Sequence, residues 1–324
     1  MATPDPNDPF PAPTAAGVPG TAVPGAPVVS ATPSGPPAGG SVEPRTTSQL
    51  TDIRRRFFRN RLAVVGLGLI TLLVVVAAFA PWLAPHDPLR QDLTNTLAGP
   101  SGEHLLGTDV LGRDQLSRII YGSRVAIVVG LASILIAVVI GVALGAVAGY
   151  FGRFWDSLIM RVADVFFAFP LLIGAIIIIV VVGRGVLPVV IALAVFSWAT
   201  VARLLRSSIL SVRESEYVEA ARSLGASRWR IVTRHVLPNS LAPVLVYATF
   251  NVGTAVVATS ALSFLGVGVS PEVPEWGNMI AAGRGFVGVA DYLWIFPSVA
   301  IVLTVLGFVF AGDGLRDALD PKLR

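Results

Sequence analysis

One run of residues decides the fold class: Val125–Gly152, which reads VAIVVGLASILIAVVIGVALGAVAGYFG. It carries no charged side chain and is longer than the roughly 20 helical residues that cross the hydrocarbon core of a bilayer. Five more charge-free runs have this character, so an all-α membrane protein with six transmembrane helices is predicted. They are Leu62–Pro85, Val165–Gly183, Gly185–Ala202, Val236–Pro271 and Tyr292–Gly312. A β-barrel is disfavoured because the runs lack alternating polar positions.

The composition supports this class and limits the chemistry. The chain has 324 residues, of which 54% are hydrophobic and 14% charged, too apolar for an ordinary soluble domain. There is no cysteine, which excludes disulfides and thiolate ligands. The one lysine, Lys322, lies between Pro321 and Leu323 and cannot belong to a phosphate-binding P-loop. No cofactor is therefore expected in this chain, and any ATP and magnesium would be bound by another subunit.

The histidines do not form a local metal motif. His86, His104 and His235 are too far apart in sequence for a ligand pair such as H-E-x-x-H, although a cluster in space stays open. No metal site is expected, and there is no nucleophile–base series of the kind that a membrane enzyme would need.

The distribution of arginine and lysine predicts the orientation. With the N-terminus inside, 18 of these residues lie in inside segments and six in outside loops, so both termini are expected to be cytoplasmic. The expected parts are a disordered Pro/Gly/Ala-rich tail (1–50), a basic segment with the first span (51–85), an extracytoplasmic loop (86–124), a five-helix core (125–312) containing a cytoplasmic loop (203–238), and a C-terminal segment (313–324).

The cytoplasmic loop is predicted to form two short amphipathic helices. An apolar face recurs at helical spacing, Gly225 reverses the chain, and Ser227 caps the second helix, which Pro238 ends. The two apolar faces consist of Tyr217, Ala220, Ala221 and Leu224, and of Trp229, Val232 and Val236. A basic loop lying on anionic lipid headgroups is the alternative interpretation.

A fixed series of residues in this loop distinguishes the two interpretations. The series is Glu219-Ala220-Ala221, Gly225, Arg228, Ile231, His235 and Pro238. It resembles the loop of permease subunits of bacterial ABC importers. The resemblance implies coupling helices that sit in a cleft of a separate ATPase, with Glu219 fixing the loop or contacting the ATPase and Gly225 forming the turn.

Three further segments resemble the C-type permease of dipeptide and oligopeptide importers: Phe57–Ala63, Leu106–Arg118 and Gly312–Pro321. The resemblance covers residues 52–324. It implies a subunit of the bacterial inner membrane that pairs with a homologous second permease, one or two cytoplasmic ABC ATPases and an extracytoplasmic solute-binding lipoprotein. The cargo would be a di- or oligopeptide, with nickel or glutathione as alternatives. A secondary transporter or channel is the rival class, and no nucleic acid is expected.

The extracytoplasmic loop contains a second motif, formed by Gly107, Asp109, Gly112, Arg113 and Asp114. Its charges and glycines suit either a solvated turn or a contact for an external solute-binding protein. The family resemblance implies an ordered element at the outer mouth.

Overall fold

The computed structural model describes residues 49–319, and these are almost entirely helical. Within that range the only β-pairing is an isolated bridge between Thr108 and Asp114. The tail predicted over residues 1–50 lies almost wholly outside the described part, as do the last residues of the C-terminal segment, including Lys322 and Arg324.

Five helices are long and apolar enough to cross a membrane, and a bent pair makes a sixth crossing if it counts as one span. The five are α2 (Arg61–Ala78), α4 (Gln115–Phe151), α7 (Val186–Val212), α11 (Ala242–Phe264) and α13 (Tyr292–Leu319). The bent pair consists of α5 (Arg153–Ala168) and α6 (Leu171–Val182). Large apolar side chains on these helices face outward, as expected where lipid is the solvent.

The third predicted span, Val165–Gly183, is not one straight helix. The chain turns by 90° between α5 and α6. Phe169 is extended (φ −101°, ψ 130°) because the ring of the following Pro170 disfavours the α conformation at the residue before it. Pro170 then precedes α6 directly.

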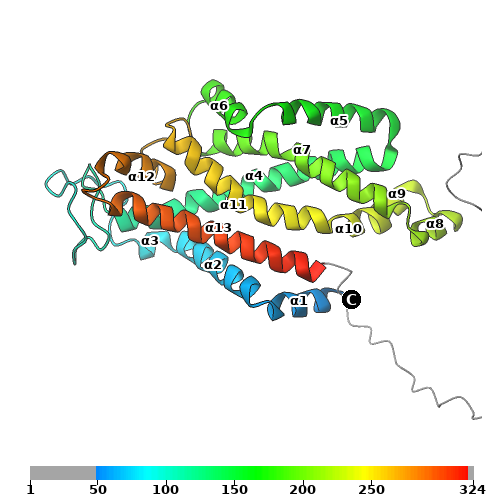
Figure 1. The fold of residues 1–324 in the computed structure, drawn as a ribbon, viewed down its shortest axis with the longest axis horizontal. Helices are drawn as coiled ribbons and strands as arrows, with labels where there is room; N and C mark the ends of the chain where they lie inside the picture. Colours follow the sequence, from blue (N-terminus) through cyan, green and yellow to red (C-terminus); the bar gives the residue numbers. More distant parts are fainter. Residues whose placement is uncertain (1–48, 320–324) are drawn as a thin grey trace, which may run out of the picture. The chain divides into compact units, whose positions relative to one another are not determined.

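The most extensive contact between two helices of the described part joins α4 and α7, which run side by side (Figure 1). Glycines along α4 let the two backbones approach closely, as small residues do in membrane helix pairs. α13 packs against α2 and α11, and α11 also contacts α4. The core between these helices contains Val129, Leu193 and Leu262, among others.

Several helices begin or end beyond the charge-free runs. α4 starts at Gln115 rather than Val125, and α7 continues past Ala202 to Val212. The remaining elements are α1 (Gln49–Arg59), α3 (Ala80–Leu83), α8 (Glu216–Ser223), α9 (Arg228–Ile231), a π-helix η1 (Val232–Val236), α10 (Leu237–Ser240), α12 (Trp276–Gly283) and a 3₁₀ turn η2 (Arg284–Phe286).

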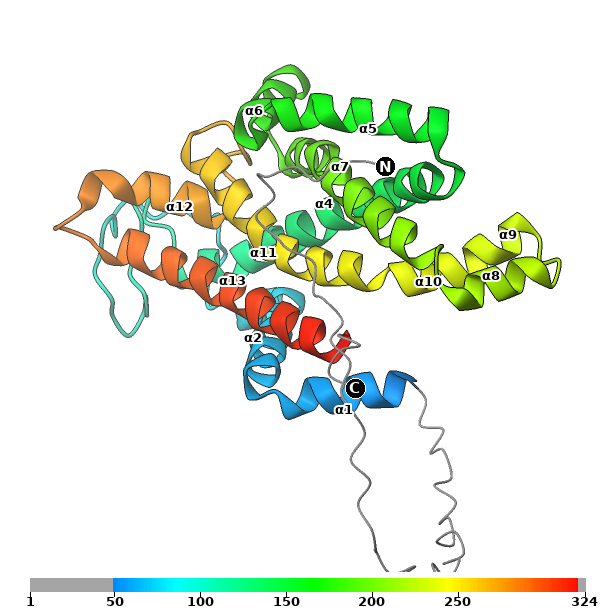
Figure 2. The same ribbon diagram turned by 45° about the vertical axis from the view of Figure 1, so that its right-hand side comes forward.

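Within the described part, α8 and α9 lie at one end of the helical bundle, and α12 and the loop before α4 lie at the other (Figures 1 and 2). These are called the α8 end and the α12 end below. α1 is also near the α8 end, where it contacts the last turns of α13.

Candidate functional site

The turn between α8 and α9 is built as the sequence predicts. Gly225 has φ +79°, a conformation that costs glycine nothing, and its amide donates to the Arg222 carbonyl at 3.0 Å. The amide of Ala226 donates to the Ala221 carbonyl at 3.1 Å, which completes the C-terminal cap of α8. Ser227 Oγ then accepts from the Arg230 amide at 3.4 Å, so the predicted cap of the second helix is confirmed.

The predicted end of the second helix at Pro238 is wrong. α9 continues through η1 into α10, which ends at Ser240, and Pro238 lies in the first turn of α10. The proline lies two residues after the end of the π-helical turn η1, where the regular i→i−4 hydrogen-bond pattern is already interrupted. Asn239 Nδ2 donates to the His235 carbonyl at 2.6 Å, which satisfies an acceptor at this junction.

A buried apolar row anchors this loop to the bundle. Val218, Ile231 and Val236 are buried and pack in one cluster with Leu205 and Ile209 of α7. The anchor in α8 is therefore Val218, and not the face predicted from the helical spacing. The α8–turn–α9 unit thus has a fixed position relative to α7.

The face that the sequence predicts as apolar in α8 is largely exposed. Leu224 is 88% exposed, Trp229 in α9 is 73% exposed, and Tyr217 is 46% exposed. Apolar side chains that form a contiguous exposed patch mark a site of interaction with a partner. Glu219, Ala220 and Arg228 are exposed beside them, and His235 is half-buried.

Seven arginines lie between residues 203 and 234, and three of them are paired with other groups of this chain. Arg203 pairs with Asp164, Arg206 pairs with Asp156 through two hydrogen bonds, and Arg213 Nη1 donates to the Gly149 carbonyl at 3.1 Å. The first two belong to α7, so the loop begins after Val212 and not at residue 203. The exposed arginines of the loop proper are Arg222, Arg228, Arg230 and Arg234.

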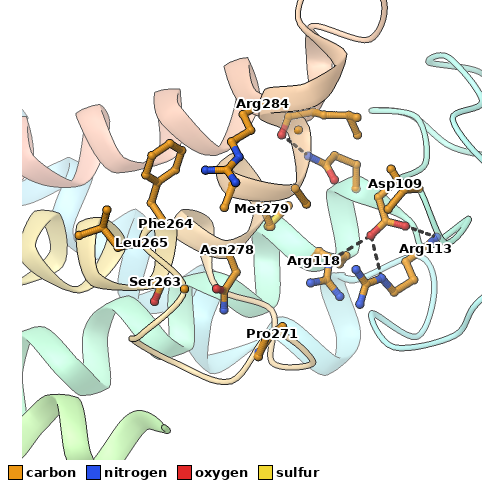
Figure 3. A pocket seen from close by; sticks show the side chains of 17 residues that line it. Asp109, Arg113, Arg118, Ser263, Phe264, Leu265, Pro271, Asn278, Met279 and Arg284 are labelled. Carbon is orange, nitrogen blue, oxygen red and sulfur yellow. Dashed lines mark hydrogen bonds and ion pairs between the residues drawn. The ribbon is translucent and has the colours of Figure 1, made fainter. Parts of the chain in front are cut away.

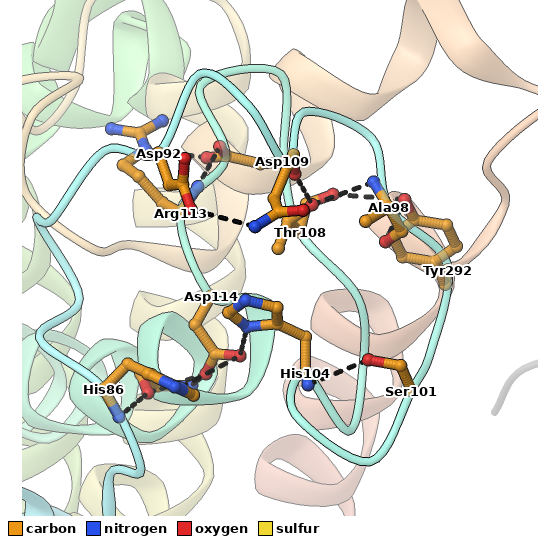
Figure 4. A network of polar contacts seen from close by, with 12 residues as sticks. His86, Asp92, Ala98, Ser101, His104, Thr108, Asp109, Arg113, Asp114 and Tyr292 are labelled. Carbon is orange, nitrogen blue, oxygen red and sulfur yellow. Dashed lines mark hydrogen bonds and ion pairs between the residues drawn. The ribbon is translucent and has the colours of Figure 1, made fainter.

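The motif before α4 forms a closed, buried turn (Figure 4). Asp109 is 5% exposed; its Oδ1 accepts from the amides of Leu111 and Arg113 at 2.8 and 3.0 Å, and its Oδ2 accepts from Arg113 Nε at 2.7 Å. A Cβ at Gly112 would lie 1.8 Å from the Asp92 carbonyl oxygen, and one at Gly107 would lie 2.7 Å from that of Ala98. The solvated-turn interpretation is therefore wrong, and the buried Asp109 is not free to contact an outside protein.

Asp114 begins α4 and is also buried. Its side chain caps the helix by accepting from the Ser117 amide at 2.8 Å and from Ser117 Oγ at 2.7 Å. Burial raises the pKa of Asp114, but hydrogen bonds from Ser117 and His104 outweigh it, so the pKa lies below its ordinary value. The carboxylate is therefore ionised at neutral pH.

A pocket of about 400 Å³ opens at the α12 end, between this turn, the end of α11 and α12 (Figure 3). Its charged lining residues are Arg113, Arg118, Arg284 and Asp109. Three guanidinium groups against one carboxylate leave an excess of positive charge. The Arg118 side chain is almost fully buried, and its Nη1 donates to the Pro88 carbonyl at 3.1 Å.

Sequence reasoning missed a buried acid beside this pocket. Glu275 caps α12 by accepting from the amides of Gly277 and Asn278 at 2.9 and 2.8 Å, and Ser260 Oγ also donates to it at 3.1 Å. Burial raises the pKa of Glu275 despite these hydrogen bonds. Its position directly before a short apolar segment is the helix-start signal that could have revealed it.

The structure is that of a multi-pass helical membrane protein, with exposed short helices at one end and a basic pocket at the other. Solved structures support the fold: a chain of the MetNI methionine ABC transporter, in inward-facing conformations, matches with a TM-score of 0.53. The match covers 63% of this chain and 96% of that one, at 20% identity.

Sequence comparisons identify the family. The family described as "Binding-protein-dependent transport system inner membrane component" matches residues 141–324, and the "N-terminal TM domain of oligopeptide transport permease C" matches residues 48–100. A dipeptide transport system permease protein of Alkalihalophilus pseudofirmus is 44% identical over 82% of this chain and 88% of its own length. A glutathione transport system permease protein of Pectobacterium atrosepticum is 44% identical over 83% and 90%. The chain belongs to the family of inner membrane components of binding-protein-dependent ABC importers.

Proposed function

We propose that this permease docks a separate ABC ATPase through α8, the Gly225 turn and α9. The observation that carries the proposal is an apolar, partly basic surface held on a rigid anchor: Leu224 and Trp229 face outward while Val218 and Ile231 are buried. A docking element that transmits motion must be fixed to the moving helices and exposed to its partner. No P-loop lysine exists in this chain, so the ATPase subunits supply ATP hydrolysis and bind ATP and magnesium.

The lipid-headgroup alternative is weaker for two reasons. Arg203, Arg206 and Arg213, which would have given the loop much of its charge, are already paired with groups of this chain. The α8–α9 unit also projects beyond the end of α7 (Figure 1), where a partner protein can reach it. Glu219 on the exposed surface would orient a partner carrying a complementary charge.

The proposed orientation places the α8 end and both termini in the cytoplasm, and the α12 end outside, facing the solute-binding protein. The positive-inside count supports it. The translocation pathway would form between this subunit and a homologous second permease, as the family resemblance implies.

The proposed cargo is a di- or oligopeptide, with glutathione as a close alternative. Two relatives at 44% identity are named for dipeptide and glutathione transport, and both cargoes bear carboxylates. The three arginines of the pocket at the α12 end suit an anionic group on its way to the pathway. Nickel, a cation, fits this lining less well.

Uptake into proteoliposomes tests the proposal. The permease would be reconstituted with its partner permease, ATPases and binding protein, and accumulation of labelled dipeptide, glutathione and nickel compared. We expect ATP-dependent accumulation of a peptide. Accumulation that persists without the ATPase subunits would instead identify a secondary transporter or channel, and accumulation of nickel alone would overturn the peptide assignment.

A further inference from the structure

Three side chains that are distant in sequence meet at the α12 end. His86 follows α3, His104 lies in the loop before α4, and Asp114 is the N-cap residue of α4. One ligand atom from each lies within 4.8 Å of the other two. His104 Nδ1 is 2.9 Å from Asp114 Oδ1, and His86 Nδ1 is 3.7 Å from the same oxygen (Figure 4).

His86 has an unsatisfied nitrogen. Its Nδ1 is buried and has no hydrogen-bond partner within the part of the chain that the structure describes. A buried polar atom without a partner is costly, and native structures rarely leave one without a reason. The 3.7 Å separation from Asp114 is too long for a hydrogen bond but leaves room for a bridging cation.

We propose that His86, His104 and Asp114 form a zinc-binding site. Two imidazole nitrogens and one carboxylate oxygen are a common three-residue ligand set for zinc, with the fourth position open to water or an incoming donor. Bond lengths near 2.0–2.1 Å place neighbouring ligand atoms of a tetrahedral site about 3.3 Å apart. The separations of 2.9 and 3.7 Å lie on either side of that value, and the third pair of ligand atoms lies within 4.8 Å.

The groups around the three side chains hold them in place. Ser117 Oγ donates to Asp114 Oδ2 at 2.7 Å and accepts from the His86 amide at 3.0 Å, so one serine links two of the ligands. Ser101 Oγ accepts from the His104 amide at 3.0 Å. Support of this kind from second-layer groups fixes ligand orientation and is a regular feature of metal sites.

The donors favour zinc over magnesium and calcium. Magnesium and calcium prefer oxygen ligands alone, whereas imidazole suits zinc, copper and nickel. The bound ion would join the segment after α3, the loop and the start of α4, and so would clamp the turn that frames the basic pocket. This role is independent of the ATPase-docking proposal, because the site lies at the opposite end of the bundle.

Direct zinc binding by the full-length chain tests the proposal. The protein would carry an affinity tag without histidine, be purified in detergent, stripped with a chelator and dialysed against buffered zinc. Its zinc content would be measured by mass spectrometry. His86→Ala is the decisive variant because the His86 imidazole makes no hydrogen bond within the described residues, so its removal should leave the loop folded. His235→Ala is the matched control, since His235 is the only other histidine and lies at the α8 end.

We expect wild type and His235→Ala to bind zinc stoichiometrically, and His86→Ala and His104→Ala to bind it about tenfold or more weakly. Cobalt added in place of zinc should give the visible absorption of a tetrahedral site in wild type and not in His86→Ala. Zinc should also raise the thermal unfolding temperature of wild type and leave that of His86→Ala unchanged. Wild-type protein that binds no zinc, or His86→Ala that binds it as tightly as wild type, would overturn the proposal and leave a plain histidine–aspartate hydrogen bond.

Discussion

Gly145→Ala tests how α4 and α7 are packed. Gly141, Gly145 and Gly149 recur at every fourth residue along α4, and α7 lies directly against them. A Cβ at Gly145 would lie 2.7 Å from the carbonyl oxygen and 3.0 Å from the Cα of Ala202. Both are backbone atoms, so no side-chain rotation relieves the contact and the helices must move apart.

The size of the effect follows from two opposing contributions. Overpacking of a close contact costs about 1–3 kcal/mol. Replacing glycine by alanine inside a helix contributes about 1 kcal/mol of stability through intrinsic propensity. Gly68→Ala in α2 is the matched control, because nothing lies within 4 Å of the added Cβ there. The propensity gain is common to both variants, so we expect Gly145→Ala to be less stable than Gly68→Ala by about 1–3 kcal/mol.

Equilibrium unfolding in mixed micelles with increasing denaturing detergent, followed by far-ultraviolet circular dichroism, measures this difference. Wild type and both variants would be compared under identical lipid and detergent conditions. If the two variants agree in unfolding free energy within about 0.5 kcal/mol, the usual range for substitutions without contacts, the close helix pair described above is refuted.

Three further predictions concern other parts of the chain. The pKa of Glu275 is raised in the folded state, so its contribution to the unfolding free energy falls as the pH rises above the ordinary value of 4.5. Glu275→Gln should therefore make the unfolding free energy depend less on pH above 4.5. An unchanged slope of unfolding free energy against pH would contradict this prediction. Asp156→Asn should lower the unfolding free energy by about 1 kcal/mol, because it disrupts the ion pair and two hydrogen bonds with Arg206. In an Arg206→Gln background the same substitution should leave the unfolding free energy unchanged. Equal losses of unfolding free energy in both backgrounds would rule out the pairing. Gly225→Ala should destabilise the α8–α9 turn by about 1–2 kcal/mol, seen as faster amide exchange there, because φ is +79° and no neighbour contacts the added Cβ; unchanged exchange would argue against the turn.

The spans could be predicted because a helix that crosses lipid carries few charged residues. The predicted span boundaries are wrong where a charged residue within a helix is paired with a group from another segment. Arg118 and Arg124 placed the predicted start of the second span at Val125, although both residues belong to α4. Their guanidinium groups donate to the carbonyls of Pro88 and Ala77, respectively, and these hydrogen bonds satisfy them. Arg203 likewise ended the predicted span at Ala202 although α7 continues, because its partner Asp164 comes from another helix, α5. No local pattern reveals such partners.

The turn at the α8 end was predictable because its determinants are local. Gly225 and Ser227 act within a few residues of their own positions. The buried face of α8 was not predictable, since Val218 is buried only because α7 packs against it. In the second predicted face, Val232 and Val236 are buried as the spacing indicates, whereas Trp229 is exposed. The histidine cluster at the α12 end was out of reach for a related reason: His86, His104 and Asp114 meet only after a long loop has folded.

Recovery of the ATPase with the permease tests the central claim most directly. The tagged permease would be co-expressed with its ATPases, and the ATPase that co-purifies would be quantified for wild type, Glu219→Lys, Leu224→Glu and Glu103→Lys. Glu103→Lys is the control, because Glu103 is exposed in the loop before α4, at the α12 end. It introduces the same change of charge as Glu219→Lys, away from the proposed docking surface. We predict full recovery with wild type and Glu103→Lys and at least about a tenfold loss with Glu219→Lys and Leu224→Glu, as expected for residues at the centre of an interface. Undiminished recovery with both α8-end variants would contradict the account.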